Sequence, residues 1–455
     1  MENAVSEKLA RFAYLLEYES TPQSCIERIK QNLLDSIGCG IFGTTTRPGQ
    51  IAANLVMELG GEGTCTLWSY QFKGPLLNVA LALGIFIHSY DFDDTHNEAK
   101  LHPASAVVPA ALCMAEELNS SGRDFLTALT AGYEVMIRTS LGAGPNAVKM
   151  RGWHLTGVCG TLGAAAAAGK LAGLDFPSLQ SALGLAGSQS AGVWAFNVEG
   201  AMSKRLHPGR AAQSGILSVL LARKGFTGPR QILEAEDGGL CRALSDEYDF
   251  RRITKDIGKV FEAEKTSIKP YPSCRSVHSS IDAVKKLKSE NTINPADIET
   301  ILVYNSKVVK VQTGWEYIPS TPLKAQMSMQ YNVAVAFLEH DVLPDQFTED
   351  KLKDPQICDL ARRVKVIVDP EIDKIYPKEF PSIVEVILKN GRRLKVRVDS
   401  PKGSPKNPLS YEEVKKKFLA LATKKISKKR AEQVIEVVDH LESLESIKQL
   451  TALLA

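Results

Sequence analysis

The stretch GAAAAAGKLAG at residues 163–173 indicates how a large share of this chain folds. Five consecutive alanines follow Gly163, and alanine has the highest helix propensity. Small side chains let neighbouring helices approach closely, so we expect this helix to lie inside a dense bundle. Residues 80–84 and 181–192 are also rich in small side chains. The sequence around this stretch therefore predicts a mainly α-helical core.

Outside the stretch, helical periodicity dominates from residue 5 to about residue 265, and it returns from Ser410 to the end of the chain. We therefore predict a large, discontinuous helical domain formed by residues 1–265 and 405–455. The later helices are expected to pack back onto the earlier ones.

The segment between these two parts has a different pattern. Alternating apolar residues predict strands at 298–304 and 364–368. The pair Asn390-Gly391 is typical of a two-residue turn and predicts a hairpin of strands 383–389 and 392–398. Helical patterns at 277–287 and 328–338 lie among the strands. Residues 266–404 are thus expected to form a smaller α+β domain.

Composition excludes several classes of protein. The 455 residues include 55 Lys and Arg against 52 Asp and Glu, and a net charge of +3 does not suit a dedicated nucleic-acid binder. We interpret the basic run from Lys415 to Arg430 as a solvated helix face. The longest apolar run, 75–87, is too short to span a membrane, which takes about 18 residues or more. The eight cysteines are widely spaced and no secretion signal is apparent, so we expect a cytoplasmic protein.

The densest polar cluster directly follows the apolar run. It reads His88-Ser-Tyr-Asp91-Phe-Asp93-Asp94-Thr95-His96, and His102-Pro103 comes shortly after it. Taken singly, Asp93 or Asp94 is best interpreted as a helix-capping residue. The whole cluster is costly to bury unless its members pair with one another or bind a ligand. It is therefore a candidate functional site.

Two cationic segments come later in the chain, and each precedes a predicted helix. Residues 203–210, SKRLHPGR, precede a helical run from about Ala211, and residues 269–278, KPYPSCRSVH, form a proline-rich loop before the next helix. The start of a helix attracts anions, and carboxylates are the natural guests. Because Lys204 and Lys269 are assigned to loops, we expect their truncation to cost little stability. Trp153-His154 adds a histidine at a third helix start.

Two other motifs are considered. Gly38-Cys-Gly40-Ile-Phe-Gly43 matches a dinucleotide-binding pattern by letter, but helical periodicity precedes it, so it is discarded. Asp93-Asp94 with Glu98 is similar to the magnesium site of isoprenoid synthases, which makes a magnesium-dependent synthase a remote alternative. A noncatalytic helical scaffold that binds a partner through its charged loops is a further alternative.

The order of these blocks resembles the MmgE/PrpD family. The match comprises residues 88–95, His102-Pro103, Trp153-His154 before Gly160-Thr-Leu-Gly-Ala, Met202-Ser-Lys204 with His207, Lys269-Pro-Tyr-Pro-Ser-Cys, and Ala325-Gln-Met-Ser-Met-Gln-Tyr331. The resemblance implies a helical domain, an α+β lid domain, a homodimer, and a cleft that binds small polycarboxylates without metal or organic cofactor.

By position, Asp91, Thr95, His102, His154, Lys204, Lys269 and Tyr331 match the active-site residues of the family, and the chemistry of the side chains suggests their roles. His102 and His154 are expected to act as acid and base, Lys204 and Lys269 to stabilise negative charge, and Asp91 to orient a partner. Tyr331 is expected to donate to a substrate oxygen from the lid. The residues expected to bind substrate are Thr95, His207, Arg210, Arg275 and His278.

The resemblance leaves the reaction open. The first interpretation is a cofactor-free lyase that dehydrates or decarboxylates a small di- or tricarboxylate. The alternative is an isomerase or epimerase of an imino- or hydroxy-dicarboxylate, similar to iminodisuccinate epimerase. Neither the substrate nor which histidine is the acid can be chosen from the residues.

Overall fold

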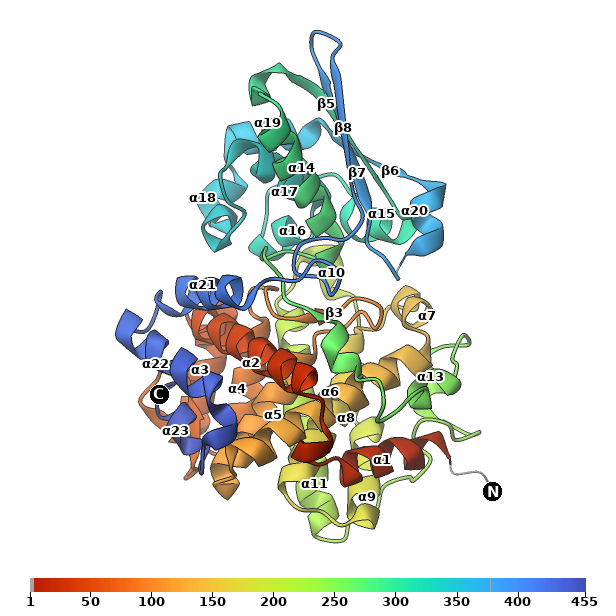
Figure 1. The fold of residues 1–455 in the computed structure, drawn as a ribbon, viewed down its shortest axis with the longest axis vertical. Helices are drawn as coiled ribbons and strands as arrows, with labels where there is room; N and C mark the ends of the chain where they lie inside the picture. The colour runs from red at the N-terminus through yellow and green to blue at the C-terminus, as the bar shows by residue number, and fades with distance from the viewer. Residues whose placement is uncertain (1–3, 377) are drawn as a thin grey trace.

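The computed structural model describes residues 4–376 and 378–455, which form a large helical part and a smaller α+β part (Figure 1). The core of the larger part runs from Leu9 to Ile268 and resumes from Leu409 to Leu454. A second core, from Tyr271 to Leu388, belongs to the smaller part. The predicted fold class is confirmed. The division after residues 265 and 404 stays a prediction.

The larger part consists of helices with four short strands. The helices are α1 (Val5–Leu15), α2 (Gln23–Gly43), α3 (Arg47–Leu59), α4 (Leu76–His88), α5 (Pro103–Leu118), α6 (Gly122–Ala143), α7 (Pro145–Met150), α8 (Leu155–Leu171), α9 (Phe176–Ser188), α10 (Phe196–Glu199), α11 (Ser203–Arg223), α12 (Leu240–Leu244), α13 (Arg251–Thr254), α21 (Tyr411–Ala422), α22 (Lys428–Asp439) and α23 (Lys448–Thr451). The strands form two antiparallel pairs, β1 (Cys65–Leu67) with β2 (Phe72–Gly74) and β3 (Thr95–His96) with β4 (Thr266–Ser267).

Helix α8 is surrounded by α5, α6, α9 and α11. Its residues 164–168 are fully buried. A Cβ atom on Gly163 would lie 2.8 Å from the carbonyl oxygen of Gly132 on α6, so only glycine permits this approach. The expected dense packing is confirmed. The homodimer that the resemblance implies stays a prediction.

The C-terminal helices pack back onto the helical part, as expected, and Figure 1 shows α21 beside α2. Lys417 on α21 departs from the predicted solvated face. Its Nζ atom lies 2.6 Å from Oδ1 of Asp35 on α2 and donates to the carbonyl oxygen of Phe92 at 2.7 Å. Lys417 is buried there because it faces α2, a contact that local sequence does not show.

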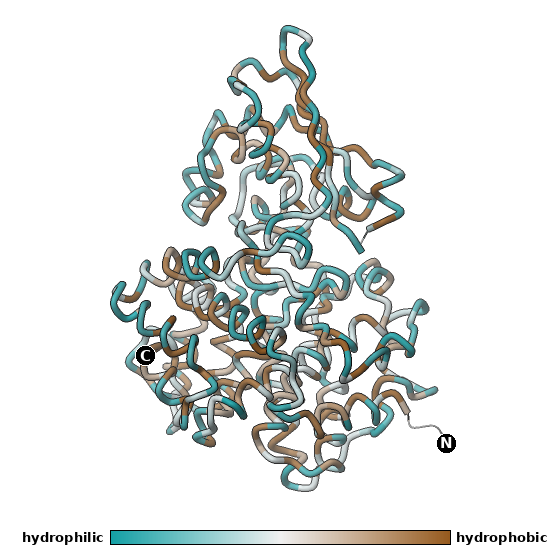
Figure 2. Tube along the Cα trace, in the orientation of Figure 1, coloured by the Kyte–Doolittle hydropathy of each residue, from teal (hydrophilic) through white to brown (hydrophobic). Residues whose placement is uncertain are grey.

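The smaller part is a four-stranded sheet covered by helices. The strand order is β6 (Val364–Val368), β5 (Ile298–Asn305), β7 (Ser382–Leu388) and β8 (Arg393–Val398), and only the β5–β6 pair is parallel. Every predicted strand is present within one residue of its expected ends. The helices are α14 (His278–Glu290), α15 (Lys307–Thr313), α16 (Pro322–Gln326), α17 (Met329–Leu338), α18 (Glu349–Leu352), α19 (Pro355–Arg362) and α20 (Pro370–Ile375). Figure 2 shows hydrophobic segments along the strands and a hydrophilic hairpin tip.

Two local features bear on the predicted motifs. The GxGxxG match at 38–43 lies inside α2, which agrees with its rejection as a nucleotide-binding loop. Helix α11 begins at Ser203 rather than near Ala211, because Pro208 is accommodated within it. Pro208 has no N–H to donate to the carbonyl oxygen of Lys204 in the first turn, yet the helix continues to Arg223. Within the described ranges, no helix has both the length and the apolar character to cross a bilayer.

Candidate active site

A cavity lies between the two parts of the molecule. The larger part, together with the segment that connects it to the smaller part, contributes these lining residues: Asp91, Thr95, Asn97, Lys100, His102, Lys149, Leu155, Trp194, Lys204 and Lys269. Residues of the smaller part line the other side: Cys274, Arg275, Ser276, Gln312, Met327, Tyr376 and Phe380. Four lysines, one arginine and one carboxylate line this space, so its electrostatic potential favours a small anion.

The pairing of two short strands assembles this cavity. Strand β3 follows the polar loop after α4, and Thr95 pairs with Ser267 of β4. This register brings Lys269, just after β4, beside Asp91 of the polar loop. Lys204 reaches the same place from the first turn of α11. Three segments that are distant in the sequence therefore meet at one carboxylate.

Asp91 is the centre of the arrangement and is 1% exposed. Its Oδ1 atom lies 2.7 Å from Nζ of Lys204 and 3.0 Å from Nζ of Lys269. Burial opposes ionisation of Asp91, but these two ammonium groups outweigh it and hold the pKa of Asp91 well below its ordinary value. The φ angle of Asp91 is +54°, a strained conformation for a non-glycine residue that is found preferentially at functional sites.

The two lysines are themselves buried, with exposed fractions of 2% for Lys204 and 0% for Lys269. The assignment of both lysines to surface-type sites is therefore wrong. Because they share the buried carboxylate of Asp91, we expect their truncation to cost stability. Burial also lowers the pKa of Lys204 to about 8, with Asp91 opposing that shift.

His102 lines the cavity and has a defined tautomer. Its Nδ1 atom lies 2.7 Å from the carbonyl oxygen of Asp94, which can only accept, so Nδ1 carries the proton. The other nitrogen, Nε2, lies 3.9 Å from Oδ1 of Asp91. Burial, followed by the nearby Lys269, holds the pKa of His102 well below its ordinary value. The ring is therefore neutral near pH 7, with Nε2 able to take a proton.

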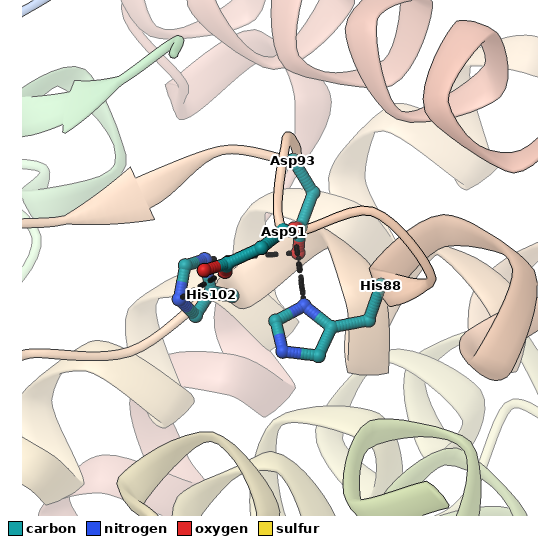
Figure 3. Close-up of side chains that lie close together, drawn as sticks. All are labelled: His88, Asp91, Asp93 and His102. Atoms are coloured by element: carbon teal, nitrogen blue, oxygen red, sulfur yellow. Dashed lines mark hydrogen bonds and ion pairs between the residues drawn. The ribbon is translucent and has the colours of Figure 1, made fainter. Parts of the chain in front are cut away.

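His88 and Asp93 lie beside this ring (Figure 3). Nδ1 of His88 lies 2.9 Å from Oδ2 of Asp93, and the His88 ring centroid lies 4.8 Å from that of His102. Asp94 has a structural role, as expected for this residue taken singly, but it satisfies the start of α5 rather than the end of α4. It accepts from the backbone N–H of Ala104 at the start of α5 and from the Tyr133 hydroxyl.

The four side chains in Figure 3 are also the group that could hold a metal ion among the described residues, because their ligand atoms lie within 4.8 Å of one another. Two imidazoles and two carboxylates would suit a transition metal. The environment of Asp91 does not fit this role, since two ammonium groups contact its Oδ1 atom and their positive charge disfavours a cation beside the same carboxylate. Glu98 contacts Arg252 instead of joining the group, so the magnesium motif is not assembled within the described ranges.

His154 and His207 form a second histidine pair. Their Nδ1 atoms lie 2.9 Å apart, so one ring donates to the other. His154 is 2% exposed, and its ring centroid lies 6.0 Å from that of His88. Neither histidine lines the cavity, and Trp194 lies beside His154 with ring centroids 5.3 Å apart.

The other predicted residues fall into two groups. Thr95 and Arg275 line the cavity. Tyr331, Arg210 and His278 do not. Tyr331 lies in the core of the smaller part, where its hydroxyl donates to the carbonyl oxygen of Gln346 at 2.6 Å. Arg210 is exposed and donates to Gln213, and the buried His278 contacts Arg275 at 3.0 Å.

Sequence reasoning missed two lysines, Lys100 and Lys149, and three aromatic residues, Trp194, Tyr376 and Phe380, that line the cavity. Lys100 lies within the polar cluster, and Lys149 lies just before Trp153-His154, but isolated lysines are usually solvated. The three aromatic residues carry no motif. Only the closeness of Lys100 and Lys149 to the recognised motifs could have suggested a role for them.

Two family models match the chain. The model of the MmgE/PrpD N-terminal domain matches residues 7–253, and that of the MmgE/PrpD C-terminal domain matches residues 271–443. The chain belongs to the MmgE/PrpD family. The resemblance found in the sequence is thus confirmed.

Relatives within the MmgE/PrpD family cover nearly the whole chain. Cis-aconitate decarboxylase of Homo sapiens is 31% identical over 472 residues, which is 100% of this chain and 95% of the relative. Cis-aconitate decarboxylase of Aspergillus terreus is 28% identical and covers 100% and 96% of the two chains. 2-Methylcitrate dehydratase of Cupriavidus necator is 23% identical and covers 86% and 84%. Decarboxylases and dehydratases are lyases, so the expected enzyme class is confirmed.

Proposed function

We propose that this MmgE/PrpD protein decarboxylates a small unsaturated tricarboxylate, with cis-aconitate as the first candidate. The full-length similarity to cis-aconitate decarboxylases carries this proposal. The surplus of basic side chains around the cavity supports it, because a substrate with three carboxylates needs more positive charge than a dicarboxylate.

The reaction releases CO2 and leaves a dicarboxylate. The bond between carbon and the departing carboxylate breaks, and its electron pair forms a new carbon–carbon double bond. The pair of the original double bond moves to the carbon beside another carboxylate, where a proton is added. Enolate-like charge develops there, and we assign its stabilisation to Lys204 and Lys269, which Asp91 holds in place.

We assign the proton transfer to His102, whose Nε2 atom is unprotonated in the free enzyme. A substrate with three negative charges raises the pKa of a nearby imidazole, so His102 takes up a proton as substrate binds and then delivers it to carbon. His154 lies outside the cavity and stays a candidate for a second proton carrier only through His88, whose ring centroid lies 6.0 Å from that of His154 and 4.8 Å from that of His102.

The test uses NMR in heavy water with cis-aconitate, citrate, 2-methylcitrate and iminodisuccinate as separate substrates. Decarboxylation of cis-aconitate should yield a dicarboxylate with one deuterium at the newly formed methylene. Water loss from 2-methylcitrate would replace the proposal by a dehydratase. Exchange of a carbon-bound hydrogen of iminodisuccinate for deuterium, without loss of CO2 or water, would replace the proposal by the epimerase alternative.

A further inference from the structure

Two lysines of the cavity have no part in the chemistry proposed above. Lys100 follows β3, and Lys149 belongs to α7, yet both line the same cavity as Asp91 and Lys204. Both side chains are half-buried. They lie close enough for Lys100 to disfavour the charged form of Lys149.

Neither ammonium group has an acidic partner within the described ranges. Nζ of Lys100 lies 3.2 Å from the hydroxyl oxygen of Tyr376 and 4.5 Å from the centroid of its ring. Nζ of Lys149 lies 3.0 Å from the centroid of the Trp194 ring. Aromatic faces attract cations but do not neutralise their charge. The two lysines differ in this respect from Lys204 and Lys269, which share Asp91.

Burial without a counter-charge has a measurable consequence. It lowers the pKa of Lys100 to about 7 and that of Lys149 to about 6. An anion placed between them would restore their charge and satisfy their donors. The two lysines are thus prepared for an anionic ligand rather than for solvent.

The backbone also holds Lys100 in place. Its φ angle is +54°, which is uncommon for a non-glycine residue. The turn is fixed on both sides, because His96 donates through its backbone to Leu101 at 2.9 Å and Ala99 donates to Nδ1 of His96 at 3.1 Å. A strained conformation that is held so firmly directs one particular side chain into the cavity.

We propose that Lys100 and Lys149 bind the substrate carboxylate that does not contact Lys204 and Lys269, and that they make the enzyme select tricarboxylates over dicarboxylates. This inference rests on the proposed function, since it assumes that the same cavity binds substrate. The contact of Lys100 with Tyr376, a residue of the smaller part, joins this subsite to both parts of the molecule.

The experiment measures binding and turnover in the variants Lys100→Met, Lys149→Met and their combination. Methionine keeps the apolar stem and removes the charge. The probes are tricarballylate, a saturated tricarboxylate that cannot react, and glutarate, which has the same chain without the central carboxylate. Arg210→Met is the matched control, because Arg210 is exposed and outside the cavity.

We expect calorimetry to show that the wild type binds tricarballylate at least tenfold more tightly than glutarate. Each single variant should weaken tricarballylate binding by about tenfold to a hundredfold, the usual loss for a charge-assisted hydrogen bond, and should change glutarate binding little. Lys149→Arg, which keeps the positive charge, should retain part of the preference for tricarballylate over glutarate that Lys149→Met loses. The single variants decide the question if the combined variant does not fold.

The two proposals fail in different ways. If the wild type turns over cis-aconitate but the lysine variants keep the preference for tricarballylate over glutarate, the subsite is overturned and the proposed function stands. If the wild type does not turn over cis-aconitate, the proposed function is overturned. Weaker tricarballylate binding in the lysine variants would still support the subsite. A wild type that shows no preference for tricarballylate overturns the subsite directly.

Discussion

Nζ of Lys204 lies 2.7 Å from Oδ1 of Asp91, and both side chains are almost fully buried. The same oxygen is 3.0 Å from Nζ of Lys269. One carboxylate between two ammonium groups leaves a net positive charge that points into the cavity and cannot be rearranged by solvent. Such fixed charge is the usual means of stabilising an anionic transition state.

We expect Lys204→Met to lower kcat/KM by on the order of a hundredfold to a thousandfold, because it removes one preorganised charge. It should also destabilise the fold by about 1–3 kcal/mol, since Asp91 loses one of two buried partners. Steady-state kinetics and urea unfolding measure the two effects. Arg210→Met is the control and should change neither. Turnover close to wild type in a folded Lys204→Met enzyme contradicts the assignment.

His102→Gln should keep substrate affinity and lose the proton-transfer step. Glutamine can still donate to the Asp94 carbonyl oxygen, but it cannot carry a proton to carbon. We expect kcat to fall by about a hundredfold to ten-thousandfold while the Kd of tricarballylate changes little. Calorimetry and single-turnover kinetics separate binding from chemistry. Weaker binding with unchanged kcat would assign His102 to recognition alone.

Anion binding should weaken as the pH rises. The charged lysine binds the carboxylate, so affinity is complete below its pKa and is lost above it. Burial lowers the pKa of Lys149 to about 6, of Lys100 to about 7 and of Lys204 to about 8. Tyr376 contacts Lys100, Trp194 contacts Lys149, and Cys274 and Lys204 line the same cavity. We expect the Kd of tricarballylate to increase from about pH 6 upwards.

The variants identify the steps of this pH profile. When both Lys100 and Lys149 are replaced by methionine, the affinity for tricarballylate should show a single decline, near pH 8. Lys204→Arg should abolish that last step, because arginine stays protonated across this range. A flat wild-type profile from pH 6 to 9 would show that these lysines do not titrate in the free enzyme.

Activity should survive removal of metal ions, because Asp91 is already paired with two lysines. The enzyme is treated with EDTA and with 1,10-phenanthroline, its metal content is measured by mass spectrometry, and turnover is compared before and after. Loss of activity that a stoichiometric divalent ion restores would favour a metal bound by the group in Figure 3.

Gly209→Ala should disturb the contact between α11 and α4. A Cβ atom there would lie 2.3 Å from the carbonyl oxygen of Leu81, and the opposite position on α4 is Gly84. The helices must separate, so we expect a loss of about 1–3 kcal/mol in the free energy of unfolding and a lower kcat through displacement of Lys204. Arg210→Ala, at the adjacent exposed position, is the control. Equal stability of the two variants would show that the helix contact yields without cost.

Patterns between near neighbours in the sequence were enough to predict much of the fold. Apolar alternation located β5 and β6, Asn390-Gly391 located the hairpin of β7 and β8, and the alanine run at 164–168 identified the buried helix. The polar cluster that begins at His88 was recognisable because so many ionisable groups directly after an apolar helix are costly to bury. These features depend on residues a few positions apart.

The composition of the site was decided by tertiary structure. Lys204 and Lys269 meet on one oxygen of Asp91 because α11 and the β3–β4 pair bring distant segments together. The same packing directs Lys100 and Lys149 into the cavity. A side chain's charge partners depend on contacts across the fold, and no periodicity of the sequence records those contacts.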